Sequence, residues 1–191
     1  MTNIVTFTGP SGSGKGYVKK AIKANLGLIE IPVYTTRQLR ENEDSTDRIS
    51  IDSAAFAAML AKHQLCLTNY LYGNYYGFNT KDIDRLRDGG RYVLELYADN
   101  VPIFHLMFQE ADMIAVLPDS LCLLESRLRK REENMDSMAA RIKNAEYELN
   151  KIKAYTGYFS LLCPVSQCNE SSVLDDIMVH VEKSMGVGRC S

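Results

Sequence analysis

The chain contains 191 residues, of which 46% are hydrophobic and 24% charged, and its formal net charge at pH 7 is −2. This length is typical of one α/β domain and suffices to bury a core without disulfides or a structural metal. The balanced charge does not favour a nucleic-acid polymer as partner, and no apolar run reaches the roughly 18 residues of a membrane span.

The cysteines and the N-terminus indicate the compartment. Five cysteines, none of them in a C-x-x-C pair, are expected to be reduced thiols. The first residues carry no basic region ahead of their short apolar stretch, so they do not resemble a signal peptide. We therefore expect a cytoplasmic protein with no membrane partner.

The N-terminal part of the chain is predicted to alternate between strands and helices. Residues 2–8 favour a strand, and a glycine-rich turn follows at 9–14. Apolar residues at helical spacing then predict a helix over 15–26. Residues 28–34 favour a second strand.

The next segment is predicted to be mainly loop and hairpin. Residues 37–48 are dense in charge and nearly free of apolar residues, which is typical of a surface loop. The pattern of residues 53–62 predicts a helix with Ser53 as its N-cap. Residues 70–78 favour a hairpin with Gly73-Asn74 at its turn.

The C-terminal half returns to strands and helices. Helices are predicted at 80–88, 121–131, 135–152 and 173–185, with Asp119 or Ser120 as the cap of the second. Strands are predicted at 91–97, 113–117 and 158–165. This alternation predicts a parallel sheet with helices on both faces.

One segment carries a motif with defined chemistry. Gly9-Pro10-Ser11-Gly12-Ser13-Gly14-Lys15 matches the P-loop pattern G-x-x-x-x-G-K between a predicted strand and a predicted helix. Glycines allow backbone N–H groups to converge on a phosphate, and the lysine adds a charge for the β- and γ-phosphates. We therefore expect ATP phosphates to bind at Gly9, Ser11, Gly12, Ser13, Gly14, Lys15 and Gly16.

Gly16 departs from this pattern, because the residue after the lysine is usually Ser or Thr and its hydroxyl holds Mg²⁺. Two interpretations stay open for Mg²⁺ as cofactor. A water completes the metal shell, which suits an ion that keeps several waters, or metal binding and turnover are weakened.

Further segments resemble one family. Tyr34-Thr35-Thr36-Arg37-Gln38-Leu39-Arg40 is similar to the T-T-R-x-x-R segment of guanylate kinases, and Gly73-Asn74-Tyr75-Tyr76-Gly77 is similar to their G-N-Y-Y-G hairpin. The arginine patterns within 124–131 and 138–148 resemble the lid helices of that family.

The resemblance implies one P-loop NTPase-type α/β domain over 1–191 with three parts. A core at about 1–33 and 81–185 would bind the nucleotide. An inserted lobe at about 34–80 would bind the phosphoryl acceptor, and a helical lid at about 127–141 would close over the transferred phosphate.

The resemblance also assigns roles to individual residues. Arg37, Arg40 and the Tyr76 hydroxyl would bind the acceptor phosphate, and Arg131 and Arg141 would join Lys15 in catalysis. Glu95 would lie near the metal. Several of these residues have a structural alternative: Arg37 and Arg40 as solvated loop charges, Tyr75 and Tyr76 as packing residues, and Glu95 as one half of an ion pair. Among Arg127, Arg129 and Arg131, at least one is expected to be a surface helix charge, with Arg129 the first candidate.

The positions at which the family reads guanine have changed. They fall at Val33, Leu67 (or Thr68), Phe78 and Tyr97, none of which is a carboxylate, so strict GMP selectivity is doubtful. A tyrosine that binds phosphate is replaced by Arg48, a candidate additional phosphate ligand. Residues 162–165 also differ from the adenine-pocket segment of the family.

The leading hypothesis is an ATP-dependent phosphotransferase that acts on a GMP-like nucleoside monophosphate. One alternative changes the acceptor to a sugar phosphate, because some of the replacements resemble ribose 1,5-bisphosphate phosphokinases. Another is a non-catalytic guanylate-kinase-like binding module. The expected partners are small molecules, and the chain is expected to be a monomer or homodimer.

Overall fold

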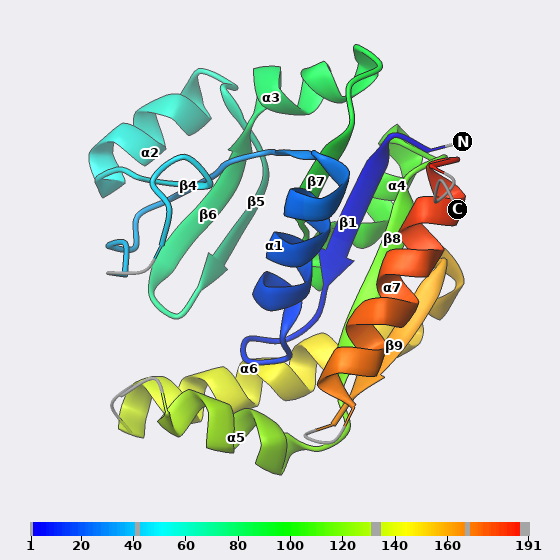
Figure 1. Cartoon of the computed structure of the whole chain (residues 1–191). Helices are drawn as coiled ribbons and strands as arrows, with labels where there is room; N and C mark the ends of the chain where they lie inside the picture. Colours follow the sequence, from blue (N-terminus) through cyan, green and yellow to red (C-terminus); the bar gives the residue numbers. More distant parts are fainter. Residues whose placement is uncertain (1, 41–42, 131–134, 167–168, 188–191) are drawn as a thin grey trace.

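The computed structural model describes residues 2–40, 43–130, 135–166 and 169–187 (Figure 1). Its central feature is a five-stranded sheet in the order β2-β7-β1-β8-β9, and every pairing is parallel. The strands are β1 (Ile4–Thr8), β2 (Ile29–Glu30), β7 (Tyr92–Glu95), β8 (Asp112–Pro118) and β9 (Leu161–Val165). All five residues of β1 are buried, as expected for a strand covered on both faces.

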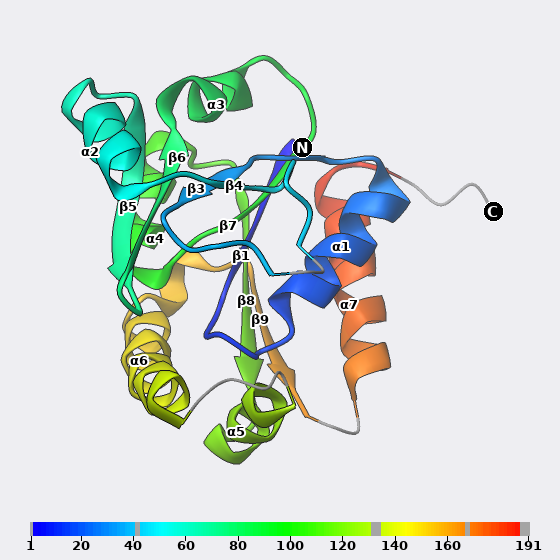
Figure 2. The same ribbon diagram turned by 90° about the vertical axis from the view of Figure 1, so that its left-hand side faces the viewer.

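Helices cover both faces of this sheet (Figure 2). On one face lie α1 (Lys15–Leu26) and α7 (Glu170–Ser184), whose apolar residues form one core cluster with β1 and β8. On the other lies α4 (Val101–Met107), which contributes Val101 and Phe104 to a second core cluster. The predicted α/β class with a parallel sheet and two helical layers is confirmed.

A second sheet lies beside the core. It has the order β4-β3-β6-β5, in which β3 pairs parallel with β4 and antiparallel with β6. The strands are β3 (Val33–Thr35), β4 (Arg48–Ser50), β5 (Leu65–Leu71) and β6 (Asn74–Asn79). The helix α2 (Ser53–Ala61) packs on it through the buried Phe56, and α3 (Thr80–Asp84) with the 3-10 turn Arg85–Arg87 leads back to the core.

Two further helices lie beyond the ends of β1 and β8 (Figure 1). They are α5 (Leu121–Arg129) and α6 (Met135–Ala154), which pack against each other. Ser120 accepts from the N–H of Leu123 and so is the cap of α5. Short 3-10 turns at Ala98–Asn100 and Thr156–Tyr158 complete the described elements.

The single strand predicted over 28–34 is wrong. Residues 29–31 bond to β7 in the core sheet, whereas β3 belongs to the second sheet. Pro32 separates them, and a proline has no N–H to continue a ladder. The chain therefore leaves the core at this residue.

Other boundaries also differ from the sequence prediction. The N-cap of α2 is Asp52, whose carboxylate accepts from the N–H of Ala55 at 2.7 Å, rather than Ser53. The hairpin turn is Tyr72-Gly73, with φ of 53° and 76°, rather than Gly73-Asn74. The last strand begins at Leu161 because residues 156–158 form a 3-10 turn, and α4 was not anticipated.

Candidate active site

A cavity of about 970 Å³ opens between the core, the second sheet and α6. Its lining joins segments that lie far apart in the sequence. The lining includes Lys15, Gly16, Arg37, Arg40, Arg48, Tyr76, Glu95, Arg141 and Glu148.

The glycine loop between β1 and α1 has the geometry of an anion cradle. Gly9, Gly12 and Gly14 have φ of 151°, 88° and 105°, and a Cβ on Gly9 would lie 2.2 Å from the carbonyl oxygen of Val116. Gly14 is the N-cap of α1 and provides no side-chain oxygen to the first N–H groups. These amides at the positive end of the helix are suited to a phosphate, so the residues present fit ATP.

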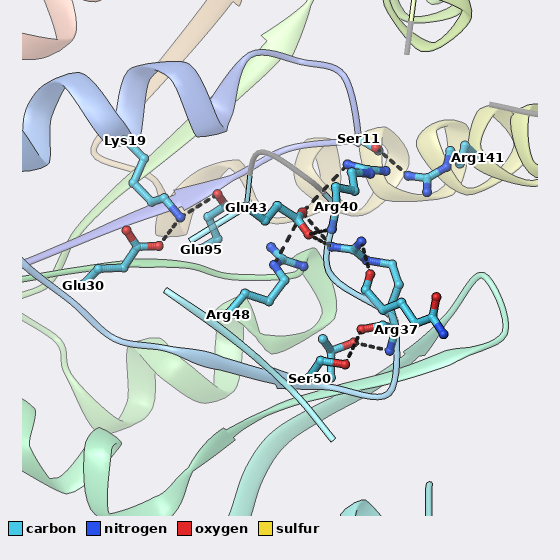
Figure 3. Close-up of polar contacts among 12 residues, drawn as sticks. Ser11, Lys19, Glu30, Arg37, Arg40, Glu43, Arg48, Ser50, Glu95 and Arg141 are labelled. Atoms are coloured by element: carbon cyan, nitrogen blue, oxygen red, sulfur yellow. Dashed lines mark hydrogen bonds and ion pairs between the residues drawn. The ribbon is translucent and has the colours of Figure 1, made fainter. Parts of the chain in front are cut away.

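Three basic side chains lie on this loop. The ammonium of Lys15 donates to the carbonyl oxygens of Gly9 and Pro10, the latter at 3.0 Å. Arg127 on α5 donates to the carbonyl oxygen of Gly12 at 2.9 Å. Arg141 on α6 donates to Ser11 Oγ at 3.0 Å (Figure 3). The remaining predicted lid residue, Arg131, lies outside the described residues.

The carboxylate of Glu95 lies at the position where the loop lacks a hydroxyl. A Cβ on Gly16 would lie 4.0 Å from Glu95 Oε1. Glu95 also forms an ion pair with Lys19 at 2.9 Å, and Lys19 in turn contacts Glu30 (Figure 3). Burial raises the pKa of Glu95, but Lys19, Lys15 and Arg48 outweigh it and lower the pKa to about 2.

This arrangement fits a magnesium ion bound together with nucleotide phosphates. Mg²⁺ is usually held by one or two carboxylates and keeps several waters. Glu95 is one ionised carboxylate beside the glycine loop. Among the described residues no group of three or more Asp, Glu, His or Cys could hold a metal by itself.

The predicted acceptor arginines converge on a carboxylate that the sequence analysis did not single out. Arg37 Nη2 lies 2.6 Å from both oxygens of Glu43, and the backbone N–H of Arg40 donates to the same carboxylate at 3.0 Å. Arg48 Nε lies 3.9 Å from it (Figure 3). Burial raises the pKa of Glu43, but these arginine contacts prevail and lower it.

The rest of the acceptor side is mainly apolar and aromatic. Val33, Leu67, Phe78 and Tyr97 all line the same cavity as Tyr76. Tyr75 instead stacks on Phe56, with ring centroids 5.4 Å apart, so of the two hairpin tyrosines Tyr75 packs the second sheet.

A polar chain joins α6 to this wall. The Tyr97 hydroxyl donates to Asn144 Oδ1, and Asn144 Nδ2 donates to the Tyr72 hydroxyl, each at 3.1 Å. The guanidinium of Arg141 lies 4.8 Å from the centroid of the Tyr72 ring. Together with the hydrogen bond from Arg141 to Ser11, these contacts join α6 to the hairpin, the core and the glycine loop.

Glu148 on α6 is a buried carboxyl group, 4% exposed, on the wall of the cavity. Burial raises its pKa to about 8, and the charges of Glu95 and Asp99 act in the same direction. Lys15 and the N–H of Gly9 oppose this rise. Glu148 is therefore mostly protonated at neutral pH.

Sequence reasoning missed Glu43 and Glu148 as cavity residues, and Arg127 as a contact of the glycine loop. Arg127 could have been found from its spacing of four residues from Arg131, and Glu148 from its spacing of seven from Arg141, since both spacings share a helix face. Glu43 offered no such signal, because an acidic residue in a charged loop is ordinarily solvated.

Comparisons with known proteins give one consistent result. A family model described as guanylate kinase matches residues 1–182. The guanylate kinase of Chlorobaculum tepidum is 30% identical over 152 residues, covering 77% of this chain and 78% of that protein. The guanylate kinase of Nitrosospira multiformis is 32% identical over 153 residues, covering 78% of this chain and 73% of that protein.

A solved structure gives the same result for the fold. The crystal structure of guanylate kinase from Anaplasma phagocytophilum matches with a TM-score of 0.70 at 21% identity, covering 99% of this chain and 88% of that one. In the described part of this chain, every helix is too short or too polar to span a membrane.

Proposed function

Since the chain belongs to the guanylate kinase family and is therefore a nucleotide kinase, we propose that it transfers the γ-phosphate of ATP to a GMP-like nucleoside monophosphate. The observation that carries this proposal is the cavity itself. The glycine loop of the core and the arginine cluster beside the second sheet line this one cavity. Phosphoryl transfer needs mainly such positioning and charge neutralisation.

On the donor side, the amides of the glycine loop and Lys15 bind the phosphates of ATP. Arg141 reaches the loop from α6 and neutralises charge on the transferred group, and Arg131 is assigned to the same task. Glu95 would hold magnesium, which would neutralise negative charge on the ATP phosphates.

On the acceptor side, Arg37, Arg40, Arg48 and the Tyr76 hydroxyl bind the phosphate. One oxygen of the acceptor phosphate attacks the γ-phosphorus of ATP, and ADP leaves. No side-chain base is required, because this oxygen is already negatively charged. The wall formed by Val33, Leu67, Phe78 and Tyr97 holds the base. Because this wall contributes no carboxylate, the base is held by shape and stacking more than by hydrogen bonds.

The two alternatives are less favoured. A sugar bisphosphate carries no base to cover the apolar side chains of Val33, Leu67 and Phe78 in this wall. A binding module without turnover does not require an intact glycine loop, a P-loop lysine and an arginine from α6 at the same cavity.

A coupled ADP-release assay with ATP and Mg²⁺ tests the proposal across GMP, dGMP, AMP, UMP and ribose 1,5-bisphosphate. We expect turnover with nucleoside monophosphates, with GMP and AMP closer in kcat/KM than a carboxylate-lined pocket would allow. Lys15→Ala serves as the inactive control. Tight ATP binding without turnover on any acceptor would contradict the proposal, and sole turnover of the sugar bisphosphate would replace it with the first alternative.

A further inference from the structure

The carboxylate of Glu43 occupies the point at which the acceptor arginines meet. Arg37 Nη2 contacts both of its oxygens at 2.6 Å, and its Oε1 also lies 3.9 Å from Arg48 Nε and 4.0 Å from Arg40 Nη1 (Figure 3). Glu43 itself lines the cavity, and its side chain is 22% exposed. Glu43 therefore shares with these arginines the cavity through which an incoming phosphate would reach them.

We propose that Glu43 is an internal stand-in for the acceptor phosphate, which an incoming phosphate displaces from the arginines. This inference rests on the proposed function only in naming the acceptor as a phosphate ester. Guanidinium groups bind carboxylate and phosphate through the same donors, so the two anions compete for Arg37. A phosphate monoester carries about twice the charge of a carboxylate near neutral pH, which favours its displacement of Glu43.

Arg37 has anchors that do not depend on Glu43. Its Nη1 donates to the carbonyl oxygen of Gln38 at 2.7 Å, and its backbone N–H donates to Thr35 Oγ1 at 3.1 Å. Its own carbonyl oxygen accepts from Ser50 Oγ at 3.0 Å. These contacts hold Arg37 in place when the carboxylate leaves.

Arg48 is anchored in the same manner, because it belongs to β4 and lies opposite Val33 of β3 in the second sheet. Arg37 and Arg48 are thus placed by backbone structure, whereas the backbone N–H of Arg40 donates to Glu43 itself. Toward Arg37 and Arg48, Glu43 contributes charge. Without it, like charges would face one another in a partly buried site, which is unfavourable for the folded protein.

The proposal predicts that one substitution will lower the stability of the protein and raise its affinity for phosphate. Glu43→Gln keeps the shape of the side chain and removes its charge. In the absence of phosphate, this variant should melt at a lower temperature than the wild type, because the arginines lose their counter-ion. It should nevertheless bind phosphate about three- to tenfold more tightly, the range expected for removing one competing charge pair.

The experiment measures the Kd of inorganic phosphate by titration calorimetry, and the melting temperature with and without phosphate, for the full chain. Asp44→Asn is the matched control, since it removes the same charge from the neighbouring residue, whose carboxylate contacts Thr46. Glu43→Asp is the second variant in case Glu43→Gln fails to fold. It keeps the charge on a shorter side chain and should also bind phosphate more tightly than the wild type.

Tighter phosphate binding by the Glu43 variants, with Asp44→Asn unchanged, would support the proposal. Equal or weaker binding by the Glu43 variants would overturn it and make Glu43 a scaffold for the arginines. An equal gain in phosphate affinity in Asp44→Asn would overturn it, because the effect would then be one of net charge. The absence of phosphate binding in every protein would also overturn it. These titrations contain no ATP and therefore do not depend on turnover. A chain that transfers no phosphate could still show the displacement of Glu43, so the two proposals can fail separately.

Discussion

Replacing Glu148 by glutamine should change how the stability of this protein depends on pH. Glu148 is buried at the wall of the cavity and its pKa is raised to about 8, against 4.5 for an unperturbed glutamate. The groups that face it from other elements are Lys15, Glu95 and Asp99. Glutamine has nearly the shape of the protonated acid but cannot ionise.

The sign follows from proton binding. Between pH 4.5 and 8 the folded protein holds a proton on Glu148 that the unfolded chain releases. The free energy of unfolding therefore falls as pH rises through this window. With these two pKa values, the loss between pH 5 and pH 8 is about 3 kcal/mol, to order of magnitude.

Urea unfolding at pH 5, 6.5 and 8 measures this effect in the wild type and in Glu148→Gln. Groups common to both proteins cancel in the difference. We expect the two free energies of unfolding to agree within about 1 kcal/mol at pH 5, and the variant to be more stable by about 3 kcal/mol at pH 8. Glu146→Gln, at an exposed position on the same helix, should give no such divergence. Parallel curves for wild type and Glu148→Gln would show that the pKa of Glu148 is not raised in the folded protein.

Three further substitutions test other parts of the site. Arg37→Ala should lower kcat/KM for the acceptor roughly 10²-fold and leave ATP affinity unchanged in calorimetry; an equal loss of ATP affinity would contradict its place on the acceptor side. Gly9→Ala should cost about 3 kcal/mol in urea unfolding, because its Cβ would meet the Val116 carbonyl oxygen at 2.2 Å and φ is 151°; an unchanged stability would show that the loop can rearrange. Gly16→Ser should lower the Mg²⁺ concentration needed for half-maximal ATP binding severalfold, because its hydroxyl adds a ligand; an unchanged concentration would contradict a metal position beside Gly16.

Features encoded within a few consecutive residues could be predicted. The helix α1 begins at Lys15 and ends at Leu26 as expected, because the glycine loop before it and Gly27 after it are local signals. The phosphate cradle is equally local, since its residues are contiguous. The parallel sheet followed from the alternation of apolar strands with amphipathic helices.

The predicted bounds of strands and turns were wrong where pairing between distant segments overrode the local sequence signal. The segment 28–34 is uniformly strand-like, but its two ends pair with different sheets across Pro32. At the hairpin, either dipeptide containing Gly73 is compatible with a tight turn. The pairing of Leu71 with Asn74 selected Tyr72-Gly73.

From the amino-acid sequence alone we could predict a phosphate-binding loop and the arginines proposed for the acceptor, because residue type and near-neighbour spacing suffice for both. The contacts that those side chains make depend on the tertiary structure. Arg127 and Gly12 are 115 residues apart, and Arg141 and Ser11 are 130 apart. The burial that raises the pKa of Glu148 exists only once α6 packs against the core. Such contacts depend on how helices and sheets pack, and local propensity carries no information about partners so distant in the chain.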